Sequence, residues 1–359
     1  MATTNTIVEG KAKLNVFAGK ISRKLPVFYN PVMKFNRDMS VHVLNALDKK
    51  DLQICLPMTG TGVRGIRFLL EVDKEKIKSV HFNDISPNAV NLINENLILN
   101  NVDMSKVVVT NKDANILFLE SKGFDYIDID PFGSPNPFLN NAIIRLSRDG
   151  VLAVTATDTS NLAGTFPDAC KRNYWAVPLN NYLMHEVGIR ILIRKVQLIA
   201  SQFDKALIPI LSYSKDHYYR VFFVCDKGKQ KADEIINQHN YLLFCKECME
   251  FKINKSNIHF CCDKEMSFAG PLWTGKLQDK DLLKKIESAD SFVKLLKSEL
   301  DVVGFFDIHA LCKKLKKPVP PANTILEKIK DSSRTQFSLY GFKTKVSLEG
   351  FINALKLNE

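Results

Sequence analysis

The chain has 359 residues, of which 45% are hydrophobic and 25% are charged, a composition typical of a globular protein with two domains. It has no uncharged apolar run of about 18 residues, and its first ten residues lack the basic start and apolar core of a secretory signal. We therefore expect no membrane association and a cytoplasmic location. The net charge of +11 and the pI of about 9.1 indicate either a polyanionic partner, usually nucleic acid, or a lysine-rich surface.

Strand-like and helical patterns alternate through the first half of the chain. The expected strands cover residues 53–56, 79–84, 106–110, 125–130 and 150–157. One expected helix ends near residue 71, and two others cover residues 88–99 and 137–148. This alternation predicts a parallel sheet with helices on both faces.

A helix over 182–203 and two strands, 206–213 and 218–225, are expected next. The short connection between these strands allows only antiparallel pairing. A parallel sheet closed by an antiparallel hairpin resembles the Rossmann-like α/β fold of class I methyltransferases. We place this domain at 1–230 and a smaller α+β domain at 231–359, which we expect to be largely helical and basic from Leu277, with one helix over 282–296.

A glycine-rich turn follows the first expected strand and contains Gly60, Gly62 and Gly65. Glycine permits positive φ and lets a ligand approach the backbone closely. The spacing alone would suit a nicotinamide cofactor equally well.

Two aspartates at later strand ends favour an adenosyl cofactor. Asp84 ends the second expected strand, where its carboxylate can accept hydrogen bonds from both ribose hydroxyls. Asp113 and Ala114 follow the third strand, where a carboxylate can accept the adenine amine. Each aspartate could instead cap a helix, although Ser86 is the more natural cap beside Asp84. Three consecutive strand ends together predict a site for S-adenosylmethionine.

The segment 128–135, Asp-Ile-Asp-Pro-Phe-Gly-Ser-Pro, ends the fourth expected strand. An acid, a proline and an aromatic residue at this position are typical of enzymes that methylate exocyclic amines. The Asp130 carboxylate and the Pro131 carbonyl would accept hydrogen bonds from the amine and direct its lone pair at the methyl group, and the carboxylate could then take a proton. Phe132 would stack on the flipped base.

Two other interpretations of this segment remain open. The segment could be a proline-rich turn with Phe132 in the core. Asp128 lies on the same side of a regular strand as Asp130 and could act instead. We favour Asp130 because it is nearer the strand end, where ligands bind in such sheets.

Four of the eight cysteines, Cys245, Cys248, Cys261 and Cys262, fall within eighteen residues. Without a secretory signal this clustering favours a metal over disulfides, and it predicts a small structural zinc site. His259 could replace Cys261 as a ligand, because adjacent side chains diverge in an extended chain. A plain loop with reduced thiols is the alternative.

The last part of the chain combines basic and aromatic residues. Lys313, Lys314, Lys316 and Lys317 form a basic run, and Arg334, Lys343 and Lys345 flank Phe337, Tyr340 and Phe342. Such residues can neutralise phosphates and stack on bases, or the lysines can simply solvate a helix end. The pattern predicts an RNA-binding surface.

Ordered motifs along nearly the whole chain resemble the archaeal and eukaryotic family of tRNA (guanine-N2-)-methyltransferases that act at tRNA position 26. The matching segments include residues 9–12, 27–31, 36–38, 61–67, 83–86, 128–135, 154–158, 185–190, 216–220, 269–273 and 333–335. The family usually has an acid at the end of the first strand, where this chain has Leu56-Pro57, and Phe-Ser-Pro near the C-terminus, where it has Phe337-Ser338-Leu339.

The resemblance implies transfer of one or two methyl groups to guanine N2 in tRNA. We expect the protein to be a monomer. The resemblance assigns cofactor contacts to Arg37, Arg67, Asp84, Asp113 and Ala114, and catalysis to Asp130. Arg37 would pair with the cofactor's carboxylate. The site chemistry alone would also suit a methyltransferase acting on rRNA or DNA bases, and a non-catalytic tRNA-binding protein is the alternative of a different class.

Overall fold

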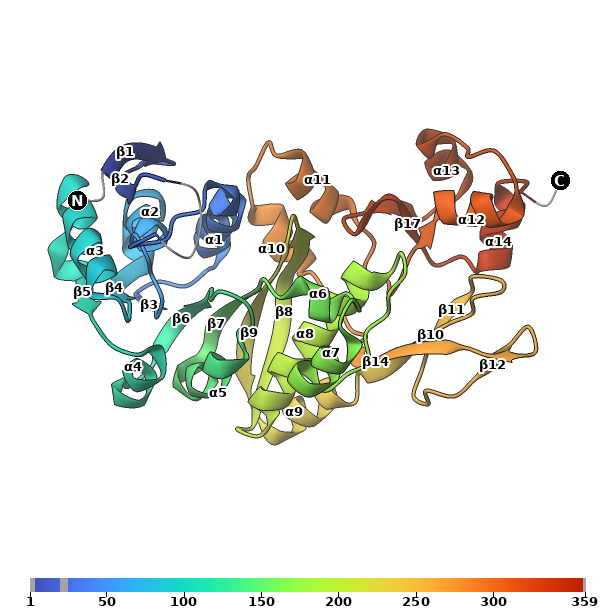
Figure 1. Ribbon diagram of the computed structural model, residues 1–359, viewed down its shortest axis with the longest axis horizontal. Coiled ribbons are helices and arrows are strands. Elements are labelled where there is room, and N and C mark those ends of the chain that lie inside the picture. Colours follow the sequence, from blue (N-terminus) through green and yellow to red (C-terminus); the bar gives the residue numbers. More distant parts are fainter. Residues whose placement is uncertain (1–3, 20–24, 358–359) are drawn as a thin grey trace. The chain divides into compact units, whose positions relative to one another are not determined.

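The computed structural model describes residues 4–19 and 25–357 (Figure 1). The chain forms two compact units. The first consists of Met1–Thr155, Phe222–Lys227 and Lys285–Glu287, and the second of Ala156–Val221, Gly228–Lys284 and Ser288–Glu359. The domain boundary that we predict at residue 230 does not coincide with these compact units. The boundary stays a prediction about folding domains.

A seven-stranded sheet has the strand order β5-β4-β3-β6-β7-β9-β8. The strands are β3 (Leu52–Leu56), β4 (Ile77–Asn83), β5 (Val107–Thr110), β6 (Phe124–Ile129), β7 (Leu146–Ala156), β8 (Lys205–Lys215) and β9 (Tyr218–Lys227). Strands β3 to β7 pair in parallel. Neighbours β8 and β9 are joined by only two residues, so they run antiparallel. The predicted sheet with its closing hairpin is confirmed.

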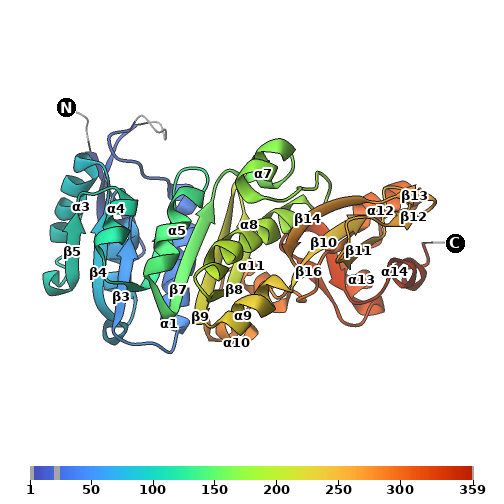
Figure 2. The ribbon, with the colours of Figure 1, turned by 90° about the horizontal axis from the view of Figure 1, so that it is seen from below.

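Helices cover both faces of the parallel part of the sheet. They are α1 (Lys34–Ala46), α2 (Val63–Glu71), α3 (Pro87–Leu99), α4 (Ala114–Glu120) and α5 (Asn136–Arg145). Helices α1 and α2 lie on one face, and α4 and α5 lie on the other (Figures 1 and 2). Strand β3 is therefore buried on both sides, and Ile54 and Cys55 are completely inaccessible, as expected for a central parallel strand.

Helix α1 and the N-terminal hairpin of β1 (Thr4–Glu9) and β2 (Ala12–Phe17) are not among the elements expected from the sequence. The Asn96 side chain binds strand β2 to α3. Its Oδ1 accepts a hydrogen bond from Asn15 N at 2.7 Å, and its Nδ2 donates one to Asn15 O at 3.1 Å. A short hairpin gains little from its own hydrogen bonds and needs such partners. These hydrogen bonds position the hairpin so that Glu9 lies close to α1 and α2.

The second unit begins with helices α6 (Thr159–Leu162), α7 (Pro167–Tyr174), α8 (Met184–Ser201) and α9 (Lys229–Ile236). A three-stranded sheet with the order β11-β10-β14 follows, built from β10 (His239–Phe244), β11 (Phe251–Asn254) and β14 (Ser267–Trp273), with the small hairpin β12 (Phe260–Cys261) and β13 (Lys264–Glu265). Helix α8 packs against β8 and β14.

The C-terminal part is less helical than we expect from the sequence. It contains α10 (Lys280–Lys285), α11 (Ser291–Ser298), α12 (Ile308–Leu315), α13 (Ala322–Lys328), α14 (Leu348–Ala354) and a sheet of β15 (Phe306–Asp307), β17 (Ser338–Thr344) and β16 (Ser332–Thr335). The single helix expected over 282–296 is wrong. Asp290 accepts a hydrogen bond from Phe292 N at 2.7 Å and starts a new helix there, which is the ordinary effect of an N-cap aspartate.

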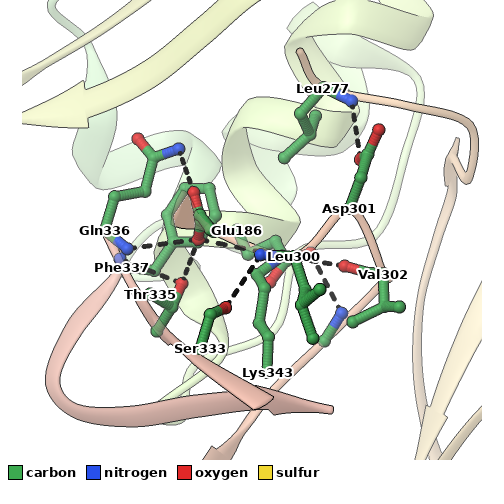
Figure 3. Close-up of polar contacts among 12 residues, drawn as sticks. Glu186, Leu277, Leu300, Asp301, Val302, Ser333, Thr335, Gln336, Phe337 and Lys343 are labelled. Atoms are coloured by element: carbon green, nitrogen blue, oxygen red, sulfur yellow. Dashed lines mark hydrogen bonds and ion pairs between the residues drawn. The ribbon is translucent and has the colours of Figure 1, made fainter. Parts of the chain in front are cut away.

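A buried ionic network joins β17 to α8 (Figure 3). Glu186 is 1% exposed and pairs with Arg190 at 2.9 Å and with Lys343 at 3.1 Å. Lys343 also donates to Val302 O at 2.8 Å, and Glu186 accepts from Gly304 N at 3.0 Å. These partners hold the pKa of the Glu186 carboxyl below its usual value, although burial opposes them. Throughout the described part of the chain, no helix is long and apolar enough to cross a membrane.

Candidate active site

The glycine turn after β3 has the conformation that a ligand-binding loop requires. Gly60 and Gly62 have φ values of +59° and +83°, which L side chains rarely adopt. A Cβ on Gly65 would lie 2.3 Å from the Phe82 ring, so this glycine permits close packing of α2 against β4. The turn thus places two glycines without side chains directly before a tightly packed helix.

Asp84 lies at the end of β4 beside this turn. Its Oδ2 accepts from Gly60 N at 2.8 Å, and its Oδ1 accepts from Ser86 N at 3.0 Å. Ser86 is at the N-cap position of α3, but its side chain makes no capping hydrogen bond, so the expectation that Ser86 would cap in place of Asp84 is wrong. Asp84 is only partly buried, and it fixes the position of the glycine turn.

Asp113 caps helix α4, as the alternative to a ligand role proposes. Its Oδ1 accepts from Asn115 N at 2.8 Å and from Ile116 N at 3.3 Å. Ala114 is the first residue of the helix and is 7% exposed. A carboxylate has further lone pairs, so capping does not remove Asp113 from the cofactor residues, and its role there stays a prediction.

Asn83 is a structural residue that we did not predict at this edge of the sheet. Its Nδ2 donates to Pro57 O and Lys112 O, both at 2.9 Å, and its Oδ1 accepts from Thr110 Oγ1 at 2.7 Å. One buried amide therefore ties together the ends of β3, β4 and β5, where the expected cofactor residues lie. The sequence signal for this role of Asn83 is its place as a side-chain amide at the end of a buried strand.

Asp130 directly follows β6 and is bound by a buried arginine. Arg64, on α2, forms an ion pair with the Asp130 carboxylate and lies 3.5 Å from Asp128 Oδ2. Its Nη1 also donates to Asn36 Oδ1 at 3.0 Å and to Ser40 Oγ at 2.7 Å. Arg64 is thus held by two residues of α1 while it holds Asp130, and this role is not among those expected from the sequence.

The two aspartates of this segment differ in accessibility. The Asp128 side chain is 1% exposed and accepts a hydrogen bond from the Tyr126 hydroxyl at 2.8 Å, whereas 22% of the Asp130 side chain is exposed. Both carboxylates face Arg64, as the alternation along a strand predicts. Only Asp130 combines this contact with access to solvent, which favours it over Asp128 as the reacting group.

Phe132 lies outside the core. It is 53% exposed, and its ring meets the ring of Phe28 edge to face, with centroids 4.6 Å apart. The interpretation of segment 128–135 as a turn that buries Phe132 is therefore wrong. Pro131 is partly buried between Asp130 and this exposed ring. A half-exposed aromatic ring that is held by one neighbouring ring is suited to stacking on a planar group.

Arg37 and Arg67 belong to a buried ion cluster with Glu9. Arg37 Nε donates to Glu9 Oε1 at 2.7 Å, and Arg67 Nη1 lies 3.0 Å from the same oxygen. Arg67 also pairs with Asp38 at 2.7 Å and with Glu71 at 2.8 Å. A cofactor carboxylate would have to share these guanidinium groups with Glu9, so the assignment of both arginines to the cofactor stays a prediction.

The charges of this cluster strongly favour ionised Glu9. Burial raises the pKa of Glu9, but hydrogen bonds and charges from Arg37 and Arg67 outweigh it and lower the pKa to about 2. The same carboxylate accepts a hydrogen bond from the Tyr29 hydroxyl at 2.8 Å. Burial and the contact with Glu9 raise the pKa of Tyr29 to about 12.

The four clustered cysteines converge in the structure. The Sγ atoms of Cys245, Cys248, Cys261 and Cys262 all lie within 4.8 Å of one another, and two of the separations are 3.5 Å and 3.9 Å. A tetrahedral zinc with Zn–S bonds of about 2.3 Å requires sulfur atoms about 3.8 Å apart. His259 is outside this group, and its ring contacts Lys252 Nζ. The donor set and its dimensions fit zinc.

The basic and aromatic residues near the C-terminus are divided between core and surface. Phe337, Phe342 and Lys343 are 6%, 1% and 1% exposed, so the expectation that they contact RNA is wrong, and Lys343 serves the ionic network described above. Tyr340 is 46% exposed. Lys313, Lys314 and Lys316 are also exposed, and Arg334 is partly so.

The family described as N2,N2-dimethylguanosine tRNA methyltransferase matches residues 4–356 of this chain. The chain belongs to this family. It is therefore a methyltransferase of guanine N2 in tRNA, and the activity, the family resemblance and the Rossmann-like fold that we expect from the sequence are confirmed.

Two curated relatives and one solved structure illustrate how close this methyltransferase is to known proteins. An Aquifex aeolicus protein named tRNA (guanine(26)-N(2)/guanine(27)-N(2))-dimethyltransferase is 39% identical, over 96% of this chain and 93% of its own. A Pyrococcus abyssi tRNA (guanine(26)-N(2))-dimethyltransferase is 37% identical, over 97% and 98%. The structure of Trm1 from Pyrococcus horikoshii with S-adenosyl-L-methionine superimposes with a TM-score of 0.89 at 35% identity, over 98% and 99%.

Proposed function

We propose that this methyltransferase uses S-adenosylmethionine to place one or two methyl groups on N2 of guanine 26 in tRNA, and that Asp130 carries the chemistry. The supporting observation is the partly exposed Asp130 carboxylate, held by Arg64 where β6 ends. The ends of β3 and β4, with the glycine turn and Asp84, belong to the same edge of the parallel sheet. Ligands bind at this edge in open α/β sheets.

The residues present fit an adenosyl cofactor. Gly60 and Gly62 carry no side chains that would keep a ligand away from the turn, and Asp84 offers carboxylate lone pairs to ribose hydroxyls. Asp113 and Ala114 would face the adenine. When bound, S-adenosylmethionine supplies an electrophilic methyl group on its sulfonium.

The protein's own task is to make a weak nucleophile reactive. The exocyclic nitrogen of guanine is a poor nucleophile because its lone pair is delocalised into the ring. The Asp130 carboxylate and the Pro131 carbonyl accept its two N–H groups and aim the lone pair. Phe132 stacks on the extruded base. As the nitrogen becomes cationic, Asp130 accepts its proton.

The test compares Asp130→Ala with Asp128→Asn by nucleoside analysis of tRNA incubated with labelled cofactor. We expect Asp130→Ala to abolish transfer while cofactor affinity stays within a few-fold, and Asp128→Asn to retain measurable transfer. A tenth or more of the wild-type rate in Asp130→Ala would contradict the catalytic role. A tRNA with adenine at position 26 is the control for the site, and rRNA and DNA substrates test the alternative activities. Failure to bind the cofactor would instead support a non-catalytic tRNA-binding protein.

We propose that the four cysteines bind one structural zinc, as their mutual distances support. Elemental analysis of protein purified without added metal should give about one zinc per chain. Cys248→Ser should lose it, whereas Cys312→Ala, which changes a buried cysteine outside the cluster, should keep it. Zinc-free protein with every thiol open to titration would contradict the proposal.

We further propose that the C-terminal basic run supplies tRNA affinity without contributing to the chemistry. A single flipped base offers few contacts and costs a few kcal/mol to unstack, so contacts elsewhere must offset that cost. Neutralising Lys313, Lys314, Lys316 and Lys317 together should weaken tRNA binding and reduce its salt dependence, and leave cofactor binding unchanged. Wild-type affinity and salt slope in this variant would show that the run only solvates a helix end.

The expected monomer and its cytoplasmic location remain proposals as well. None of the eight cysteines, all of which lie in the described part of the chain, forms a disulfide, and this fits a reducing compartment. Light scattering of the purified protein at working concentration tests the monomer, and fractionation of the source cells tests the location.

A further inference from the structure

A groove of about 230 Å³ opens in the second unit, on the C-terminal sheet. It is lined by α12, the connection to α13, α13 itself and the hairpin of β16 and β17. The volume is below the range of about 300–1,000 Å³ that is typical for drug-sized ligands, so only a small group fits in it. None of the residues assigned above to the catalytic site or the cysteine cluster lines it.

Large apolar side chains around this groove are unusually accessible. Leu339, Tyr340 and Val319 are 77%, 46% and 43% exposed, respectively. A contiguous exposed apolar patch marks an interaction site more often than isolated apolar residues do. The Tyr340 ring stacks on His309 with centroids 3.6 Å apart and planes 24° apart. The tyrosine is therefore held in one orientation while nearly half of its surface remains open.

Arg334 provides a second planar group in the groove. Its Nη2 donates to Leu339 O across the β16–β17 hairpin, and its guanidinium lies 5.3 Å from the centre of the Phe342 ring. These contacts fix the guanidinium plane and leave other N–H groups available. A fixed guanidinium both stacks on rings and donates to carbonyl or phosphate oxygens.

The surroundings of the groove are basic. Residues 306–345 contain nine Lys or Arg against three Asp or Glu. Lys343 and Asp307 are buried, so eight basic and two acidic side chains remain to face a partner. Strong positive charge beside accessible aromatic rings is the combination that binds single-stranded nucleic acid, whereas a protein-binding groove needs no such charge.

The order of elements around the groove supports the same occupant. Helix α12, a connection, helix α13 and the β16–β17 hairpin follow one another, and β15 pairs with the second strand of the hairpin. Helix-turn-helix modules also have two consecutive helices joined by a connection, and they place one of these helices against nucleic acid.

We propose that this groove binds an unpaired base of the substrate tRNA, a nucleotide other than the guanine that is methylated. The base stacks on Tyr340 and receives a hydrogen bond from Arg334, and Lys313 and Lys316 contact the flanking phosphates. This inference rests on the proposed tRNA methyltransferase function and adds a second point of RNA recognition to it.

The test measures tRNA affinity at several salt concentrations for Tyr340→Ala, Tyr340→Phe and Tyr340→Trp. Removing a stacking ring should weaken binding roughly 5- to 100-fold while leaving the salt slope unchanged, because no phosphate contact is lost. Tyr340→Phe and Tyr340→Trp keep a ring and should bind within about two- to threefold of wild type. Phe166→Ala is the matched control, because Phe166 is 57% exposed and lies outside the groove.

Three outcomes would overturn the inference: wild-type affinity in Tyr340→Ala, an equal loss in Tyr340→Phe and Tyr340→Trp, or a flattened salt slope in Tyr340→Ala. The variant in which the four lysines of the basic run are neutralised distinguishes failure of the base-binding groove from failure of the proposal that the C-terminal basic run binds tRNA. If the lysine variant loses affinity and Tyr340→Ala does not, the C-terminal basic run still binds tRNA and only the base-binding groove is refuted. Methylation of tRNA at saturating concentration monitors the folded catalytic unit in every variant.

Discussion

Replacing Arg64 by lysine tests whether a buried guanidinium orients the reacting carboxylate. The guanidinium donates to Asp130, Asn36 and Ser40 at once, whereas an ammonium keeps the charge but cannot reproduce this planar fork. Losing one hydrogen bond to a charged group costs about 1.5–3 kcal/mol. If that energy is realised in the transition state, kcat should fall roughly 10- to 100-fold, and cofactor affinity should stay within a few-fold.

The assay is single-turnover methyl transfer at saturating tRNA and cofactor, with thermal unfolding measured in parallel. Arg64→Ala is less informative, because it also leaves Asp128 buried without its counter-charge and should destabilise the fold by about 3–5 kcal/mol. The matched control is Arg145→Lys, since Arg145 donates only to backbone oxygens of Phe118 and Leu119 in the contacts we describe. A wild-type rate in Arg64→Lys, alongside an inactive Asp130→Ala, would refute the positioning role.

Three further predictions concern the cofactor, pH and the ionic network. Asp84→Ala should weaken cofactor binding about tenfold to a hundredfold, and unchanged affinity by calorimetry would leave Asp84 as a loop anchor only. Glu9→Gln should lower the free energy of unfolding by roughly 1–3 kcal/mol near neutral pH. The pKa of Glu9 is lowered to about 2 in the folded state. The difference in the free energy of unfolding between the variant and wild type should therefore be largest above about pH 4.5, shrink as the pH falls toward 2, and be absent below pH 2. Denaturant titrations that show the same difference at every pH would contradict this. Lys343→Met should destabilise the protein by about 3–5 kcal/mol without changing cofactor affinity, and unaltered thermal unfolding would show that Glu186 is satisfied by Arg190 alone.

The parallel sheet could be predicted from the sequence because its strands are local patterns. Each strand of the sheet is an apolar run that ends near a glycine, asparagine or aspartate, and the alternation of strands with helices indicates parallel pairing. The same locality made the Asp130 segment and the glycine turn visible. The helix expected over 282–296 failed because one aspartate, Asp290, interrupts a continuous apolar period by capping a new helix. The periodicity of apolar residues does not reveal a break between two helices when both helices keep the same apolar spacing.

The partners of buried charges could not be predicted, because they come from distant parts of the chain. Arg64 and Asp130 are 66 residues apart, and Lys343 and Glu186 are 157 apart. A lysine in a basic run and a lysine that neutralises a buried glutamate have the same local sequence signature. The distinction arises only when folding removes one of them from water, since a buried charge must find a counter-charge, whereas an exposed one need not. Lys343 thus belongs to the fold and Lys313 to the surface, and an RNA-binding site inferred from composition has to be corrected by burial before its residues are assigned.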